Sequence, residues 1–166
     1  MSSWGALTLA ALTATAGTGL PTIRYDAPPP NFAIPSPHGA SYLSALRGRV
    51  VVVDFWASWC DVCTAEMKYF VRAKQTYGDR IAVVTVSSEP HDVAASYFRL
   101  WNIELTVVED LSGAISRAYG VTKIPVTLVL GPNGNVSYVS VGGLSWKELQ
   151  GAIAQAAGTP APRVLQ

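Results

Sequence analysis

The stretch from Val50 to Cys63 reads VVVVDFWASWCDVC, and it carries the clearest fold signal in the chain. Its first seven residues, Val50 to Trp56, are apolar except for Asp54. Such a continuous apolar run is typical of a strand buried on both faces, as in the centre of a mostly parallel sheet. From Cys60 to Tyr77 the apolar residues have helical spacing, and Gly78 is placed to end the helix. The stretch therefore predicts a buried strand that leads directly into a helix.

The two cysteines at this junction, Cys60 and Cys63, are the only two in the chain. At positions i and i+3 of a first helical turn, two thiols can reach disulfide distance and can also separate as a dithiol. Cys60 is expected at the helix N-terminus, where unpaired N–H groups and the helix dipole stabilise a thiolate. Cys63, one turn deeper, is expected to be the less exposed, resolving thiol. A domain of this size needs no disulfide for stability, so the pair indicates redox chemistry.

A zinc site is the main alternative for two neighbouring cysteines. It would need His38 and His91, which lie 22 positions before Cys60 and 28 positions after Cys63. Neither spacing matches a recognised zinc pattern. We therefore expect no metal, and no cofactor other than the redox-active disulfide Cys60–Cys63.

The rest of the chain alternates between short apolar runs and helical patterns. Strands are expected at 31–34, 80–87, 105–108, 126–130 and 136–141, and helices at 41–46, 90–101, 110–120 and from Ser145 onward. Asn133-Gly134 between two alternating runs predicts a hairpin, and Ser145 with Glu148 matches a capping box. This order predicts an α/β fold in which helices flank a mixed central sheet.

The first 30 residues differ in composition from the rest. Trp4 to Leu20 is apolar and uncharged, and a run of three prolines, Pro28 to Pro30, follows. The 17 residues from Trp4 to Leu20 are marginal for a membrane span. An export signal normally opens with basic residues, and here the first basic residue is Arg24, although Ala14-Thr15-Ala16 matches a signal cleavage pattern. We expect the remnant of an export signal or a membrane anchor here. The alternative is a tail without structure.

Length and charge set further bounds. At 166 residues the chain suits one domain, expected at 31–157 between a tail at 1–30 and a disordered tail at 158–166. The formal net charge is +1, and the basic residues are scattered singly. This pattern supplies no basic field for nucleic acid, so no nucleic-acid partner is expected.

The motif Val53 to Cys63, together with Ile124-Pro125 ahead of the predicted hairpin, resembles the thioredoxin superfamily. Two further features resemble one branch, the TlpA/ResA-like exported thiol–disulfide oxidoreductases. Ala27 to Gly48 is similar to the N-terminal extension of that branch, and Pro90 to Glu109 is similar to its inserted helix–strand unit. The resemblance covers Ala27 to about Ala157 and implies a thioredoxin fold that carries both additions.

The resemblance also implies a substrate-binding surface beside the cysteines. Pro125 would be a cis-proline that faces Cys60 and presents backbone groups to a substrate chain. Ile124 precedes it, and Trp59 directly adjoins Cys60. We therefore expect Trp59, Ile124 and Pro125 to contact the substrate.

Two carboxylates are candidates for proton transfer. Asp54 lies in an otherwise apolar strand, and an unpaired buried aspartate is too costly to be kept for packing. Glu66 lies three residues after Cys63 on the cysteine face of the helix, where a buried carboxyl could exchange a proton with Cys63. By the resemblance, Asp54 matches the buried aspartate of thioredoxins and Glu66 the glutamate of the exported branch. The alternative for Glu66 is a first-turn acid that interacts with the helix dipole.

Asp61 and Val62 separate the cysteines, where the superfamily usually has a proline before the second cysteine. The negative charge beside Cys60 disfavours its thiolate and favours a reductant over a strong oxidant. The resemblance implies an extracytoplasmic reductant of protein disulfides, with cytochrome c apoprotein cysteines as one substrate class and a membrane thiol reductase as electron donor. Alternatives are a general cytosolic thioredoxin, a thiol peroxidase and a non-enzymatic redox-sensing or binding module.

Overall fold

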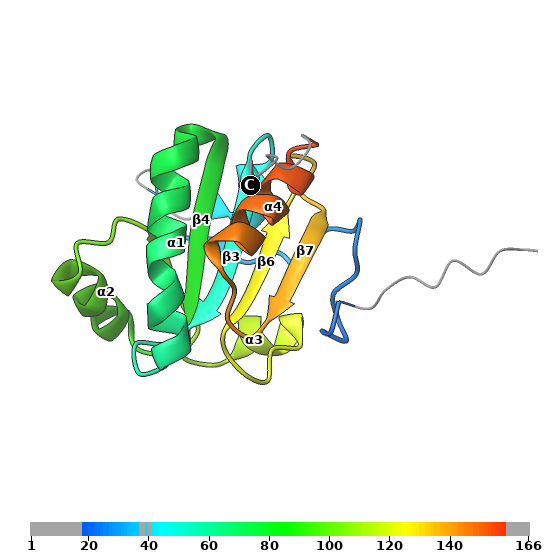
Figure 1. The fold of residues 1–166 in the computed structure, drawn as a ribbon. Helices are drawn as coiled ribbons and strands as arrows, with labels where there is room; N and C mark the ends of the chain where they lie inside the picture. The colour runs from blue at the N-terminus through cyan, green and yellow to red at the C-terminus, as the bar shows by residue number, and fades with distance from the viewer. Residues whose placement is uncertain (1–17, 37–38, 40, 159–166) are drawn as a thin grey trace, which may run out of the picture.

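The computed structural model describes residues 18–36, 39 and 41–158. Its centre is a five-stranded sheet in the order β5-β4-β3-β6-β7 (Figure 1). The strands are β3 (Val50–Trp56), β4 (Ile81–Ser87), β5 (Thr106–Glu109), β6 (Val126–Leu130) and β7 (Val136–Val141). β3, β4 and β5 run parallel, whereas β6 is antiparallel to β3 and to β7. The sheet is therefore mixed, with β3 at its centre.

Helices cover both faces of this sheet. They are α1 (Asp61–Tyr77), α2 (His91–Leu100), α3 (Ala114–Tyr119) and α4 (Trp146–Ala156). α1, α2 and α4 share one hydrophobic cluster with one face, and α3 packs with the N-terminal segment on the other face. Short elements complete the fold: β1 (Ala33–Ile34), β2 (Ser41–Tyr42) and the 3-10 helices η1 (Leu43–Leu46) and η2 (Gly78–Arg80).

Strand β3 explains how this sequence builds both halves of the core. All seven of its residues are buried, and alternate side chains point to opposite faces. Val52 and Trp56 belong to the cluster under α1, α2 and α4, whereas Val53 and Phe55 belong to the cluster under α3. Asp54 alternates with these residues and so faces α1, the helix that carries the cysteines.

The inserted unit extends the sheet by one strand and adds one helix. α2 packs through Phe98, whose ring stacks on that of Trp56 with centroids 5.1 Å apart. β5 then pairs with β4 at the edge of the sheet. Trp101 is 63% exposed, because it follows the last residue of α2 and the chain turns there.

The N-terminal boundary differs from the expected one. Leu20 and Ile23 are buried in the cluster under α3, although residues 1–30 were expected to form a separate tail. Val136 exchanges backbone hydrogen bonds with this segment, accepting from Asp26 at 2.9 Å and donating to Ala27 at 2.9 Å. The packed domain therefore includes residues 18–30. Residues 1–17 and 159–166, where the rest of the expected tails falls, lie outside the described residues.

Other bounds are close to the expected ones. The strands expected at 126–130 and 136–141 match β6 and β7. The helix expected at 41–46 is instead a short strand followed by a 3-10 turn.

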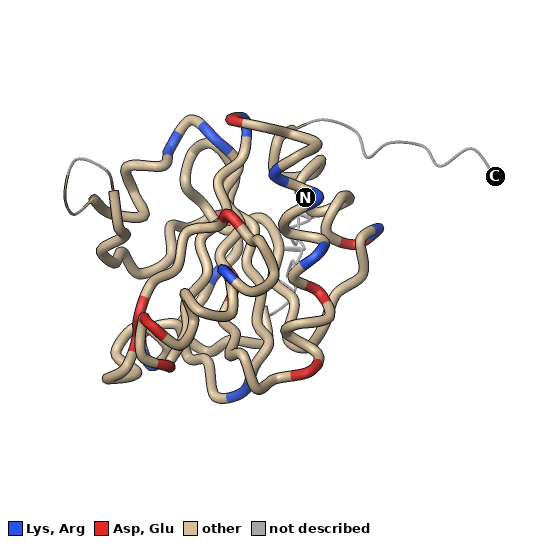
Figure 2. The backbone as a smooth tube through the Cα atoms, turned by 90° about the vertical axis from the view of Figure 1, so that its left-hand side faces the viewer, with Lys and Arg blue, Asp and Glu red and all other residues tan. Residues whose placement is uncertain are grey.

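None of the helices in the described part of the chain has the length and hydropathy needed to cross a membrane. Basic and acidic positions are interspersed along the side of the backbone that Figure 2 shows.

Candidate active site at the Cys60–Cys63 disulfide

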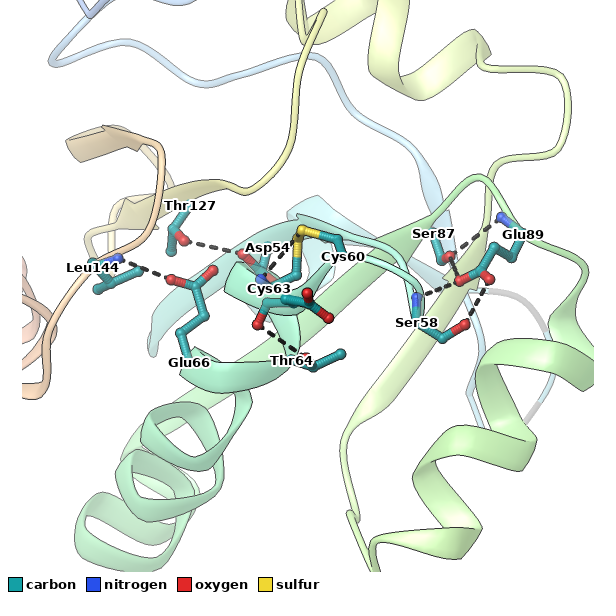
Figure 3. Close-up of a disulfide and its surroundings, with 11 residues drawn as sticks. Asp54, Ser58, Cys60, Cys63, Thr64, Glu66, Ser87, Glu89, Thr127 and Leu144 are labelled. Carbon is teal, nitrogen blue, oxygen red and sulfur yellow. Dashed lines mark hydrogen bonds between the residues drawn. A yellow bond between two sulfur atoms is a disulfide. The ribbon is translucent and has the colours of Figure 1, made fainter.

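The cysteines lie where β3 passes into α1, and they form a disulfide with Cα atoms 5.2 Å apart (Figure 3). Cys60 is the N-cap of α1, and its sulfur accepts a hydrogen bond from the Cys63 N–H at 3.3 Å. Cys60 is half-buried, whereas Cys63 is fully buried. This is the arrangement expected for an outer thiol that meets substrate and an inner thiol that resolves the product.

The loop before the cysteines is anchored by Glu89, which the sequence did not single out. The Glu89 carboxylate accepts hydrogen bonds from the Ser58 N–H at 2.6 Å, the Ser58 hydroxyl at 2.7 Å and the Ser87 hydroxyl at 3.3 Å. Ser58 lies 31 positions from Glu89 in the chain, so only the pairing of β3 with β4 brings them together. These hydrogen bonds connect Glu89, at the start of the inserted unit, to Ser58, which lies two positions before Cys60.

The expected substrate-binding residues occupy the same end of the sheet. The Ile124–Pro125 peptide bond is cis, as the resemblance implied. The Pro125 carbonyl accepts a hydrogen bond from the Gly142 N–H at 2.9 Å, and Ile124 packs against both hydrophobic clusters. The Trp59 side chain is 70% exposed, so it offers an apolar surface to solvent next to Cys60.

Asp54 is fully buried in the middle of the sheet. One of its oxygens, Oδ1, accepts a hydrogen bond from the Thr127 hydroxyl at 3.0 Å, whereas Oδ2 has no partner among the described residues. Burial raises the pKa of Asp54 well above its usual value, the negative charge of Glu66 raises it further, and the Thr127 hydrogen bond opposes the shift. Asp54 is therefore a carboxyl that retains its proton above the usual range.

Glu66 is 2% exposed, and it enters the same region from α1. Its Oε2 accepts a hydrogen bond from the Leu144 N–H at 2.9 Å, and its Oε1 has no partner in the described part of the chain. Burial raises the pKa of Glu66 to about 7, and the Leu144 hydrogen bond limits the shift. The first-turn acid of α1 is Asp61, so the alternative of Glu66 as a first-turn dipole residue is wrong.

Zinc ligands do not gather around the cysteines in the described residues. No group of three or more His, Cys, Asp or Glu side chains there is placed to hold a metal ion. His91 is exposed at the start of α2, where its backbone N–H donates to the Glu109 carboxylate at 2.6 Å. His38 lies outside the described residues.

Comparisons with known proteins agree with this geometry. Residues 26–139 match the AhpC/TSA family model. The thiol-disulfide oxidoreductase ResA of Oceanobacillus iheyensis is 31% identical over 111 residues, which cover 66% of this chain and 58% of ResA. The thioredoxin-like protein YneN of Bacillus subtilis is 28% identical over 126 residues, which cover 73% of this chain and 74% of YneN. The chain thus spans less than two thirds of the length of the Oceanobacillus relative.

Solved structures agree on the fold. The thiol:disulfide interchange protein DsbE of Chlorobium tepidum superposes with a TM-score of 0.72 at 30% identity, covering 81% of this chain and 98% of that one. A thioredoxin from Neisseria meningitidis superposes with a TM-score of 0.69 at 25% identity, covering 79% and 91%. Sheet order, cysteine position and these matches agree. The chain therefore belongs to the AhpC/TSA family, and its fold is the thioredoxin fold.

Proposed function

We propose that this protein is a thiol–disulfide oxidoreductase that exchanges disulfides with partner proteins through Cys60 and Cys63. The observation that carries the proposal is a disulfide at the start of α1 in which one cysteine is half-exposed and the other fully buried. Relatives named as thiol-disulfide oxidoreductases support the same reaction. The partners are therefore protein thiols and disulfides.

The reaction uses the two cysteines in turn. In the reduced protein, the Cys60 thiolate attacks one sulfur of a substrate disulfide, which forms a mixed disulfide and releases the other substrate sulfur as a thiolate. Cys63 then loses its proton and attacks the Cys60 sulfur. This restores the Cys60–Cys63 disulfide, breaks the mixed disulfide and releases the second substrate thiolate. Two electrons thus pass to the substrate, and a thiol donor must return them for the next cycle.

Asp54 and Glu66 assist the second step in this proposal. A thiolate is costly where Cys63 is buried, so its proton must pass to a nearby group. Because burial raises the pKa of both carboxyls, each can exchange a proton closer to neutral pH than an exposed carboxyl can. Trp59, Ile124 and Pro125 form the surface that receives the substrate chain.

The direction and place of the reaction are further parts of the proposal. Asp61 is exposed directly after Cys60, and its charge favours a reductant. The similarity to bacterial ResA and DsbE proteins supports an extracytoplasmic location. In that setting the donor would be a membrane thiol reductase, the segment before the domain a membrane anchor, and cytochrome c apoproteins one substrate class. A general cytosolic thioredoxin and a non-enzymatic redox-sensing or binding module are the alternatives.

Cysteine variants test the proposal directly. We expect the wild-type protein to reduce insulin disulfides with a dithiol donor, and Cys60→Ser to abolish this activity. Cys63→Ser should instead accumulate a mixed disulfide through Cys60, which mass spectrometry of the trapped species identifies. A wild-type protein that binds thiol proteins but does not accelerate insulin reduction would be a binding module, and trapping through Cys63 would reverse the two roles.

A further inference from the structure

Two buried carboxyls lie beside Cys63, and each has one oxygen without a hydrogen-bond partner among the described residues. Asp54 comes from β3 and Glu66 from α1, and Figure 3 shows their side chains pointing toward the same space beside the disulfide. Thr127 holds one oxygen of Asp54, and the Leu144 N–H holds one oxygen of Glu66. The remaining oxygens, Asp54 Oδ2 and Glu66 Oε1, are buried and lack a hydrogen bond within the described residues.

We propose that Asp54 and Glu66 act as one acid–base unit that holds a single proton between Asp54 Oδ2 and Glu66 Oε1, directly or through one water. The role of this proton in disulfide exchange rests on the proposed function, whereas the sharing of the proton between the two carboxyls does not. A proton in this position satisfies both free oxygens at once. Two separately ionised carboxylates would be two like charges buried in the same region, each with one oxygen that lacks a hydrogen bond in the described chain, which is far more costly.

The surroundings of the pair favour a shared proton over two ionised groups. Among the charged groups of the described chain, Glu66 is the one that shifts the pKa of Asp54. The groups that face the pair from β6 and from the loop before α4, Thr127 and the Leu144 N–H, are neutral donors. The disulfide-bonded cysteines carry no charge. No described cation therefore offsets the repulsion between two carboxylates, so one of them must retain a proton.

The two carboxyls differ in how readily they ionise. Glu66 has a pKa of about 7, and Asp54 then has to ionise beside an existing negative charge, which raises its pKa further. Glu66 is thus the base of the pair near neutral pH, and Asp54 is the group that keeps the proton. Each titration step belongs to the pair rather than to one residue.

The pair has a defined place in the second step of exchange. The Cys63 thiol gives its proton to the unit, which goes from one proton to two while its charge goes from −1 to zero. The electron pair left on Cys63 forms the new bond to the Cys60 sulfur, and the electrons of the mixed disulfide leave with the substrate sulfur. The unit can then return its extra proton to solvent or to the departing thiolate.

Isotope-edited NMR of the oxidised protein tests for the shared proton without any substrate. With the side-chain carboxyl carbons of Asp and Glu labelled, we expect Asp54 and Glu66 each to report the same two titration steps. In Glu66→Gln the Asp54 carboxyl should titrate in one step, shifted to lower pH by about one unit or more. In Asp54→Asn the Glu66 carboxyl should likewise titrate in one step. Independent titrations that do not respond to the partner's substitution would overturn the inference.

The rate of mixed-disulfide resolution gives a second readout. We expect Asp54→Asn with Glu66→Gln to slow resolution no more than the slower single variant, because removing either group breaks the same unit. The matched control is Asp92→Asn, which removes an exposed carboxylate of α2 whose side chain makes no hydrogen bond in the described chain and should change neither readout. Single effects that multiply in the double variant would contradict the shared unit. A wild-type protein that does not exchange disulfides would refute the proposed function and leave the NMR result standing.

Discussion

Glu66 is the residue at which a buried charge has its clearest consequence for stability. Its pKa is about 7 in the folded protein against 4.5 for an ordinary glutamate, so the folded state binds this proton more tightly than the unfolded chain does. For an acid with a raised pKa, the favourable contribution to stability is complete below the ordinary pKa. It is lost as the pH rises through the folded value.

Glu66→Gln should therefore alter the pH dependence of stability. The amide oxygen can still accept from the Leu144 N–H, but the side chain no longer ionises. From about pH 5 to about pH 8 we expect the wild type to lose on the order of 2–3 kcal/mol more of its free energy of unfolding than the variant. Urea unfolding at a series of pH values measures this difference. Parallel curves for the two proteins would mean that folding does not raise the pKa of Glu66.

At the residue scale, most of the candidate catalytic residues could be predicted from the sequence, but the residue that anchors the loop before Cys60 could not. The sequence pattern identified four candidate residues, because their types are unusual at the junction of an apolar strand and a helix: Asp54, Cys60, Cys63 and Glu66. Glu89 was not among them, because its role depends on hydrogen bonds to Ser58 across two neighbouring strands. A carboxylate just ahead of a helix has an ordinary local explanation, and nothing in the sequence pattern shows that it anchors a distant loop.

At the scale of elements, Glu89 links the inserted α2–β5 unit to the loop that carries Cys60. Glu89→Gln removes the charge that strengthens its three accepted hydrogen bonds while keeping the shape of the side chain. We expect a loss of about 1–3 kcal/mol in the free energy of unfolding and slower attack by Cys60, because the loop is held less firmly. Chemical denaturation and the alkylation rate of the reduced protein measure the two effects.

The control for this variant comes from the same inserted unit. Glu104→Gln changes an exposed carboxylate between α2 and β5 that makes no hydrogen bond in the described chain. It should alter neither stability nor alkylation. A Glu89 variant with wild-type alkylation but lower stability would show that the network serves the fold alone.

Local patterns predicted elements best where the pattern and the packing agree. β3 is apolar throughout and buried on both faces, and β6 and β7 flank an Asn-Gly turn, so their bounds match the expected ones. The helix expected at 110–120 begins only at Ala114. Asp110 still stabilises the first turn of this helix, because the Asp110 carboxylate accepts hydrogen bonds from the N–H groups of Ile115 and Ser116 across the intervening turn. Sequence spacing alone could not show that a cap acts from this distance.

At the scale of the whole molecule, the segment of residues 18–30 belongs to the domain. Its few apolar side chains are separated by prolines and polar residues, so no periodic pattern marks it as part of a core. The Tyr119 hydroxyl donates at 2.7 Å to the carbonyl of Pro30, which is 89 positions away in the chain. Partners this distant in the chain are visible only once the sheet has formed, which explains why the sequence placed the boundary too late.

Ile23 tests whether this segment contributes to stability. It is 5% exposed in the cluster under α3, so Ile23→Ala should lower the free energy of unfolding by about 2–4 kcal/mol through lost burial and an unfilled cavity. The adjacent exposed residue provides the control, and Arg24→Ala should stay within about 0.5 kcal/mol of the wild type. Denaturant unfolding measures both. Equal stabilities for the two variants would mean that residues 18–30 are a tail after all. A selective loss in Ile23→Ala would mean that a chain starting at residue 31 lacks part of the core on which the strand bearing Asp54 is packed.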